Sequence, residues 1–311
     1  MRSPVWAVTS YFAFDDPPGT KRRLQTYRRF RERLQVPLVT VEHAPDGNFD
    51  LQEGDAEVLI QRSGGAMLWQ KERLLNLGLE HLPAACDSVV WIDCDMVFER
   101  DNWPQALGEA LQETPVVQPF RTIRLLRDGE FPETTEEAPE REDWRSFGYC
   151  FAAGLVPPEA FQSSTVGPDL RIAGGFVWAA RRELLDRHGL YDAMILGGGD
   201  KGIVCAACGH ADAFPASRDM SPEQARHYLD WARPFEREVA GRVGDVPGRV
   251  FHLWHGDLRN RRYRGRYEDF ARLGFAPGEH LRLTEEGVWD WSGEPAEVRR
   301  RVKEYFDARR G

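Results

Sequence analysis

The first half of the chain alternates between two hydrophobic periods. Short runs rich in β-branched and aromatic residues predict strands at 5–11, 37–41 and 57–61. Residues 21–34 and 66–81 instead repeat their apolar positions near the 3.6-residue period of an amphipathic helix. Strands that alternate with helices in this way predict βαβ units and a mainly parallel sheet flanked by helices.

The apolar run 88–98 is the most informative segment, because it contains two carboxylates, Asp93 and Asp95. Its composition and short length predict a strand that is covered on both faces. Alternate residues of a strand point to the same side, so both carboxylates can converge on one cation. The alternative is that the acids only cap a turn at the end of the strand.

Ligands of open α/β sheets bind beyond the carboxyl ends of the strands, where Asp93 and Asp95 are expected. Paired oxygen ligands suit Mg²⁺ or Mn²⁺, and such ions commonly share their coordination shell with substrate phosphates. The first hypothesis is therefore a phosphate-bearing substrate held together with a divalent metal.

Regular patterns continue in the second half of the chain. Residues 116–120 and 174–180 predict further strands, and 181–188 predicts a helix. Residues 128–143 are acidic and contain proline without any period, which is typical of either a mobile lid or a plain surface loop. We found no repeat and no linker, so the pattern indicates one domain with an elaboration at residues 266–311.

Two later motifs carry candidate chemistry. The turn Leu196–Lys201 contains three consecutive glycines before Asp200, which allows backbone conformations closed to other residues and close approach by a ligand. Asp200 is therefore either a functional acid or only a helix N-cap. His252 and His255 lie three residues apart beside a tryptophan, and either could complete a metal shell that two carboxylates leave open.

Lys71 and Glu42 lie on predicted elements that border the acid-containing strand. Lys71 could reach a phosphate, although a solvated helix face explains it equally well. Glu42, after the second strand, could accept a hydrogen bond from a base or a ribose.

Composition and charge limit the function classes. The 311 residues are 41% hydrophobic and carry a net charge of −9, which is typical of a globular protein without general attraction to nucleic acid or anionic membranes. An arginine-rich segment, 259–267, could grip an RNA backbone, neutralise a diphosphate or solvate a helix face, but the acidic remainder disfavours nucleic acid. No apolar stretch is long enough to span a bilayer, and no signal-peptide pattern opens the chain, so we expect a cytoplasmic location.

The five cysteines form an odd and scattered set, which argues against a disulfide framework. Cys205 and Cys208 make a single CxxC with no second pair at zinc-site spacing. We therefore interpret them as buried thiols on a helix rather than as a redox or zinc site.

The order of these motifs resembles that of glycosyltransferases with the GT-A fold, over roughly residues 5–265. An opening strand, an Asp-x-Asp, a Gly-Gly strand–helix unit, a glycine-rich turn with an acid and a late histidine follow one another in this family's order. The glycine-rich turn departs from the acceptor-side motif of galactosyl-type transferases, because it has no tryptophan and a single acid. This departure leaves the donor sugar open.

The resemblance implies a Rossmann-like α/β fold and a metal-dependent transfer from a nucleotide sugar, most simply a UDP-sugar, to a glycan, lipid or small-molecule acceptor. It divides the chain into a catalytic domain, 1–265, with a nucleotide-sugar half at 1–120 and an acceptor half at 170–265, and the C-terminal extension. The metal ligands would be Asp93, Asp95 and at least one of His252 and His255. Donor-binding candidates are Ser10, Tyr11, Glu42, Lys71, Asp93 and Arg259.

Asp200 is the candidate general base if the reaction inverts the anomeric centre, and a hydroxyl-binding residue if it retains the configuration. We favour inversion. The main alternative is a phosphatase of the haloacid dehalogenase type, with Asp93 as nucleophile and Asp95 as general acid. That family places its Asp-x-Asp on the first strand, whereas about ninety residues of predicted α/β structure precede Asp93 here. A sugar-1-phosphate nucleotidyltransferase lacks support because no glycine-rich phosphate loop opens the chain, and a non-catalytic sugar-binding module remains a further alternative.

Overall fold

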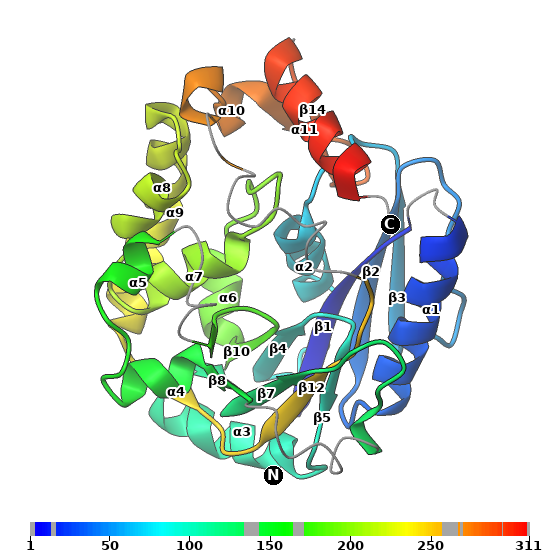
Figure 1. The fold of residues 1–311 in the computed structure, drawn as a ribbon, viewed down its shortest axis with the longest axis vertical. Helices are drawn as coiled ribbons and strands as arrows, with labels where there is room; N and C mark the ends of the chain where they lie inside the picture. Colours follow the sequence, from blue (N-terminus) through cyan, green and yellow to red (C-terminus); the bar gives the residue numbers. More distant parts are fainter. Residues whose placement is uncertain are drawn as a thin grey trace.

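A seven-stranded sheet forms the centre of the molecule (Figure 1), in the order β11-β6-β10-β4-β1-β2-β3. The computed structural model describes residues 4–13, 17–133, 143–163, 171–256, 267, 270–293 and 295–309. The strands are β1 (Val5–Phe12), β2 (Leu38–Ala44), β3 (Val58–Ser63), β4 (Ser88–Ile92), β6 (Val116–Gln118), β10 (Val177–Arg181) and β11 (Val243–Asp245). The four strands from β4 to β3 are parallel, and β10 runs antiparallel to both of its neighbours. The predicted α/β class with a mainly parallel central sheet is confirmed.

Helices cover both faces of this sheet because the residues of its central strands alternate between two cores. Val89 and Trp91 of β4 pack on one side, and Val90 and Ile92 pack on the other. Helices that contribute to the first core include α2 (Lys71–Leu79), α6 (Arg182–His188), α7 (Gly199–Ala207) and α9 (Pro222–Val239). The second core contains side chains of α1 (Pro17–Glu32) and α3 (Trp103–Glu113). The predicted coverage of this strand on both faces is confirmed.

The run 88–98 is not one strand, and that prediction was wrong. β4 ends at Ile92, a turn follows, and β5 (Met96–Phe98) joins a second sheet of five strands in the order β5-β12-β7-β8-β9. The other strands of this sheet are β7 (Thr122–Leu125), β8 (Trp144–Ser146), β9 (Ile172–Ala173) and β12 (Arg249–His252). A continuous apolar run hides the break, because β5 is as fully buried as β4.

The C-terminal segment packs against the start of α2. It comprises the 3₁₀ helix Phe270–Leu273, α10 (Pro277–His280), the hairpin of β13 (Leu281–Leu283) and β14 (Trp289–Trp291), and α11 (Ala296–Arg309). The backbone N–H of Trp289 donates to Oε1 of Gln70 at 2.7 Å, and its indole N–H donates to the carbonyl of Asp192 at 3.0 Å. Three short helices complete the fold: α4 (Phe147–Ala152), α5 (Glu159–Gln162) and α8 (Ala213–Ser217).

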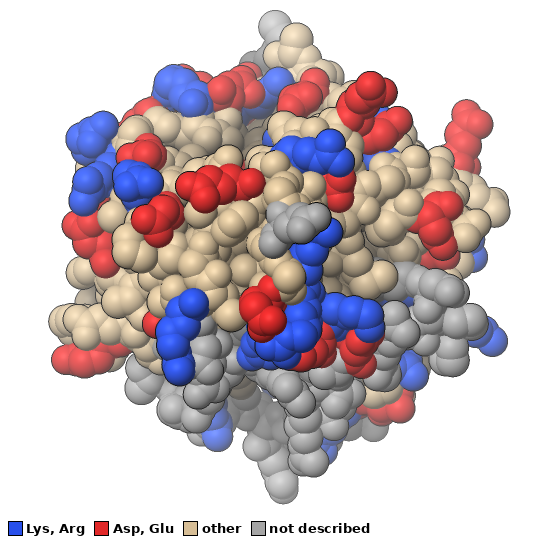
Figure 2. All heavy atoms as spheres, turned by 90° about the horizontal axis from the view of Figure 1, so that it is seen from above, with Lys and Arg blue, Asp and Glu red and all other residues tan. Residues whose placement is uncertain are grey.

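Most of the acidic segment 128–143 lies outside the described residues, and so does the arginine-rich segment except for Tyr267. Asp143 is described at the end of the first of these and accepts hydrogen bonds from Arg124 and Arg249, both at 2.7 Å. Among the described residues, no helix is long and apolar enough to cross a membrane. Figure 2 shows basic and acidic side chains interspersed over one face of the molecule.

Candidate functional site

Asp93, Cys94 and Asp95 form the turn that leaves β4 at the carboxyl edge of the parallel strands. The backbone N–H of Asp93 donates to the carbonyl of Phe176 at 2.9 Å. The hydroxyl of Thr9 on β1 donates to the carbonyl of Ile92 at 2.6 Å. These bonds fix the backbone of the turn, from which the two carboxylates reach different partners.

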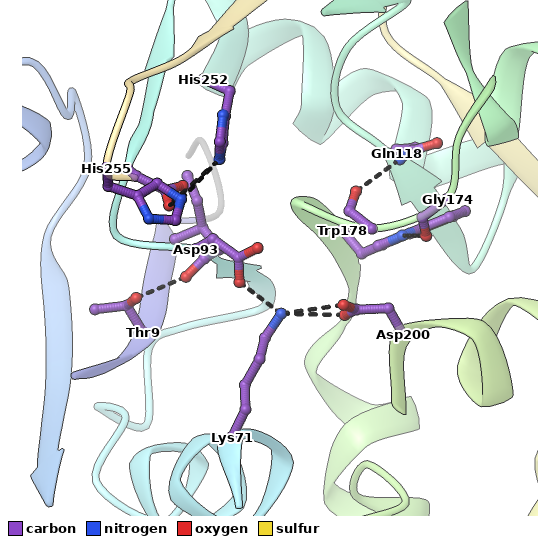
Figure 3. A network of polar contacts seen from close by, with 12 residues as sticks. Thr9, Lys71, Asp93, Gln118, Gly174, Trp178, Asp200, His252 and His255 are labelled. Atoms are coloured by element: carbon purple, nitrogen blue, oxygen red, sulfur yellow. Dashed lines mark hydrogen bonds and ion pairs between the residues drawn. The ribbon is translucent and has the colours of Figure 1, made fainter. Parts of the chain in front are cut away.

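Lys71, the first residue of α2, lies between Asp93 and Asp200 (Figure 3). Its Nζ is 2.5 Å from Oδ1 of Asp93, and 3.2 and 3.3 Å from the two carboxylate oxygens of Asp200. Burial alone would lower the pKa of Lys71, but Asp200 and Asp93 outweigh it and hold that pKa well above 10.5. The predicted phosphate-binding lysine is thus a buried cation that joins two of the predicted site carboxylates.

Asp95 forms a second cluster with His252 and His255. Oδ2 of Asp95 is 3.0 Å from Nε2 of His255 and 3.5 Å from Nε2 of His252, and the two Nε2 atoms are 3.2 Å apart. Oδ1 of Asp95 is buried and has no hydrogen-bond partner. Burial would raise the pKa of Asp95, but the two imidazoles hold it well below 3.8. One oxygen and two imidazole nitrogens within 4.8 Å of one another suit a Mn²⁺-like or Zn²⁺-like cation.

The pairing of β5 with β12 brings this second cluster together. His252 lies opposite Met96 in that antiparallel pair, and the backbone N–H of Leu253 donates to the carbonyl of Asp95 at 2.8 Å. The ring of Phe176 lies edge-on to that of His252, with centroids 5.2 Å apart. Phe176 has a φ of 77°, a region that non-glycine residues rarely adopt and that is typical of functional sites.

Three glycines place Asp200. Gly197 and Gly198 have φ values of 79° and 92°, and a Cβ on Gly199 would lie 2.3 Å from Oε1 of Glu72. The first two glycines are therefore needed for backbone conformation, and the third for space. The N-cap of α7 is Gly198, whereas Asp200 lies within the first turn. The interpretation of Asp200 as only an N-cap is wrong.

Hydrogen bonds from the side chains of Gln118 and Trp178 fix the backbone of residues 173–175, which lies opposite Asp200. Nε2 of Gln118 donates to the carbonyls of Ala173 and Gly175, both at 3.1 Å, and the indole N–H of Trp178 donates to Gly174 at 3.0 Å (Figure 3). A Cβ on Gly175 would lie 3.1 Å from Oδ2 of Asp200. Sequence analysis predicted the strand that contains Gly174 but missed Gln118, which has no motif and acts on a segment 55 residues away.

Glu72 is a second residue that sequence analysis missed. Its side chain is buried next to Gly199, and its Oε2 has no hydrogen-bond partner. Burial and the negative charge of Asp200 raise its pKa to about 8, although Lys71 acts in the opposite direction. The only signal in the sequence was its position directly after Lys71 on a predicted helix.

The predicted donor-binding residues of β1 and β2 lie at the same edge of the sheet. The hydroxyl of Tyr11 donates to Oδ2 of Asp50 at 3.0 Å. Oε1 of Glu42 accepts from the backbone N–H groups of Asp50 and Leu51, at 2.5 and 3.2 Å. Both side chains thus fix the segment that follows β2. Ser10 is half-buried on β1.

Arg259 lies outside the described residues. The thiols of Cys205 and Cys208 are free and buried, and burial raises both of their pKa values, that of Cys205 to about 12. Cys205 lies in α7 and Cys208 is its C-cap, which agrees with the interpretation of the CxxC as buried thiols at a helix.

Among known proteins, only solved structures show similarity to this chain. No family model and no curated protein matches the chain. Glucosyl-3-phosphoglycerate synthase from Mycobacterium tuberculosis, solved with Mn²⁺, UDP and phosphoglyceric acid, aligns over 95% of this chain and 91% of its own at 15% identity, with a TM-score of 0.39. Drosophila β1,4-galactosyltransferase 7, solved with xylobiose, aligns over 93% of each chain at 11% identity, with a TM-score of 0.35. Likeness at this level assigns neither a family nor an activity to the chain.

Proposed function

We propose that this protein is a metal-dependent glycosyltransferase of the GT-A type that moves a sugar from a nucleoside-diphosphate sugar, in the first place a UDP-sugar, to an acceptor hydroxyl. The observation that supports this most is the juxtaposition of two clusters at the carboxyl edge of β4. One is the Asp95–His252–His255 cluster, and the other is the pair of carboxylates that Lys71 joins. In open α/β sheets this edge is where nucleotides bind.

Asp95, His252 and His255 would hold the metal ion, and we keep Asp93 as a fourth proposed ligand through the carboxylate oxygen that does not face Lys71. A mixed oxygen and nitrogen set suits Mn²⁺ better than Mg²⁺, which prefers oxygen alone. When bound, the ion supplies positive charge against the developing charge of the departing diphosphate.

Asp200 is the proposed general base of an inverting transfer. Both of its oxygens are within 3.3 Å of the Lys71 ammonium, and these hydrogen bonds fix the direction of the carboxylate. Gly175 leaves room for this carboxylate, because a Cβ there would lie 3.1 Å from its Oδ2. A carboxylate held in this way can accept the proton of an acceptor hydroxyl as that hydroxyl attacks the anomeric carbon.

Donor binding is proposed for Ser10, Tyr11, Glu42, Lys71, Asp93 and Arg259. All but Arg259 lie in the nucleotide-sugar half, 1–120, that the GT-A resemblance implies. Support for Tyr11 and Glu42 comes from their hydrogen bonds to residues 50 and 51, which place that segment beside the ends of β1 and β2. In this scheme residues 266–311 form an extension packed on the catalytic domain.

The deciding experiment incubates the purified protein with a panel of nucleotide sugars, with and without Mn²⁺, and measures release of nucleoside diphosphate. We expect release that needs Mn²⁺ and that falls at least 100-fold in Asp95→Asn. Asp212→Asn is the matched control, since this carboxylate is exposed and pairs with Arg233 at the surface. Asp200→Asn should lose transfer to acceptors more than it loses slow hydrolysis of the donor.

Two results would overturn the proposal. One is metal-dependent hydrolysis of p-nitrophenyl phosphate without turnover of any nucleotide sugar, which is the result expected of a phosphatase. The other is full activity in Asp95→Asn. The anomeric configuration of the first product, read by proton NMR, then separates inversion from retention.

A further inference from the structure

Two buried side chains behind the proposed base have polar atoms without partners. Lys201 is 4% exposed and Gln224 is fully buried. Nζ of Lys201 and both amide atoms of Gln224 make no hydrogen bond. A buried polar group without a partner destabilises the folded protein, and a charged one does so more strongly, so each such group requires a ligand or water.

Lys201 lies in the first turn of α7 and Gln224 in the first turn of α9. α7 packs against α9, and the hydroxyl of Tyr228 on α9 donates to the carbonyl of Gly202 on α7 at 2.7 Å. After the end of α7, the backbone N–H of Ala211 donates to Oε1 of Glu236, near the end of α9, at 3.0 Å. The order of these two contacts indicates that the chain advances in the same direction along α7 and α9, so that Gln224, one turn before Tyr228, lies toward the start of α7.

The surroundings of Lys201 are positive. Burial lowers the pKa of Lys201 to about 8; Cys205 opposes this effect, and the nearby positive charge of Arg218 adds to it. Arg218 is itself 5% exposed, and its guanidinium lies 5.7 Å from the ring centroid of Tyr267. The Tyr267 hydroxyl donates to the carbonyl of Gly197 at 2.7 Å. A second buried cation thus lies beneath the turn that carries Asp200.

We propose that Lys201 Nζ and the carboxamide of Gln224 bind an oxyanion, phosphate or carboxylate, between the first turns of α7 and α9. The ammonium and the amide N–H₂ would donate to its oxygens, and Oε1 of Gln224 would accept from a hydroxyl that it carries. The oxyanion is either a free ion or an anionic group of the acceptor. The second source rests on the proposed function, because Lys201 directly follows the proposed base Asp200.

The first test measures thermal unfolding in inorganic phosphate against sodium chloride of equal ionic strength. At ten times the dissociation constant, phosphate should raise the midpoint of the wild type and of Lys303→Met by about 2 °C. Lys303 is the matched control because its ammonium is exposed and pairs with Asp307 at the surface. Lys201→Met and Gln224→Leu should each lose this shift. An equal shift in Lys201→Met would overturn a site for the free ion.

The second test addresses the acceptor and uses a pair of sugars that differ in one phosphate group, glucose and glucose 6-phosphate. If the oxyanion belongs to the acceptor, the phosphorylated sugar should have a KM about tenfold lower or better, and Lys201→Met should remove that preference. The preference concerns the acceptor alone, so slow metal-dependent hydrolysis of the donor reports separately on the proposed function. No phosphate shift in the wild type together with no preference between the two sugars would overturn the proposal.

Discussion

At the scale of single residues, the contact between Glu72 and Gly199 controls how closely α7 approaches α2. A Cβ on Gly199 would lie 2.3 Å from Oε1 and 2.4 Å from Cδ of Glu72, distances at which one of the two residues must move. Glu72 is fully buried and has a raised pKa, so in the folded protein it is a neutral acid at pH 7 rather than an additional negative charge beside Asp200. The acidic site therefore carries less charge than its sequence implies.

Glu72→Gln should stabilise the protein increasingly as the pH rises from about 5 to about 8. The folded-state pKa of Glu72, about 8, is above the ordinary value of 4.5, so between these values the unfolded chain releases a proton that the folded chain keeps. The wild type therefore loses stability over this window, and glutamine does not, by roughly 2–4 kcal/mol in total. Urea unfolding at several pH values measures this. Glu80→Gln, an exposed substitution at the end of the same helix, should behave as the wild type.

Gly199→Ala should destabilise the protein by about 2–4 kcal/mol and abolish transfer, because the added methyl group displaces the first turn of α7 and Asp200 with it. Adding Glu72→Ala should restore a large part of the lost stability, which a double-mutant cycle of urea midpoints would report as a non-additive gain. Gly108→Ala in α3 meets nothing within 4 Å and should be neutral or stabilising. Strictly additive effects at positions 72 and 199 would contradict this explanation.

At the scale of elements, sequence periodicity predicted most of the first half of the fold. Strands β1 to β4 and helices α1, α2 and α6 lie close to the predicted ranges, because the apolar positions within each of these segments follow the period of the element that forms. Sequence periodicity failed to predict elements whose structure depends on pairing with a segment far away in the sequence. β5 is a strand of the second sheet because β12, about 150 residues later, pairs with it. β9 and β11 have only two and three residues, too few for any period.

Lys71→Met should affect three elements at once, because this side chain joins the start of α2 to the end of β4 and to the start of α7. Its removal leaves two half-buried carboxylates facing each other without the cation between them, which should cost about 3 kcal/mol of stability and lower transfer at least 100-fold. Urea midpoints and nucleoside diphosphate release measure the two effects. Lys303→Met, which removes a surface ion pair, should change neither. A stable and active Lys71→Met would show that the bridge between Asp93 and Asp200 has no role.

At the scale of the whole molecule, the site is assembled from residues that are far apart in the sequence. Lys71, Asp93, Asp95, Asp200, His252 and His255 were all candidates from residue type and order alone. What the sequence could not predict is that they divide into two clusters, with Asp93 on Lys71 and Asp95 on the histidines. That division follows from the break after β4, which directs the two acids to partners on different sheets and helices. Glu72, Gln118 and Gln224 were missed because single polar residues within helices and strands carry no pattern.

Metal binding should stabilise the whole protein, because the proposed ligands come from the β4–β5 turn and from the end of β12, and an ion held by both would oppose their separation. Saturating Mn²⁺ should raise the thermal midpoint by about 2–4 °C, and EDTA should reverse this. Asp95→Asn and His255→Ala should each abolish the shift. His81→Ala, at an exposed histidine in the turn after α2 that bonds to the carbonyl of Leu77, should keep it. An unchanged Mn²⁺ shift in both ligand variants would place the metal elsewhere in the molecule and leave the Asp95–His252–His255 cluster as an ion pair that only joins the two sheets.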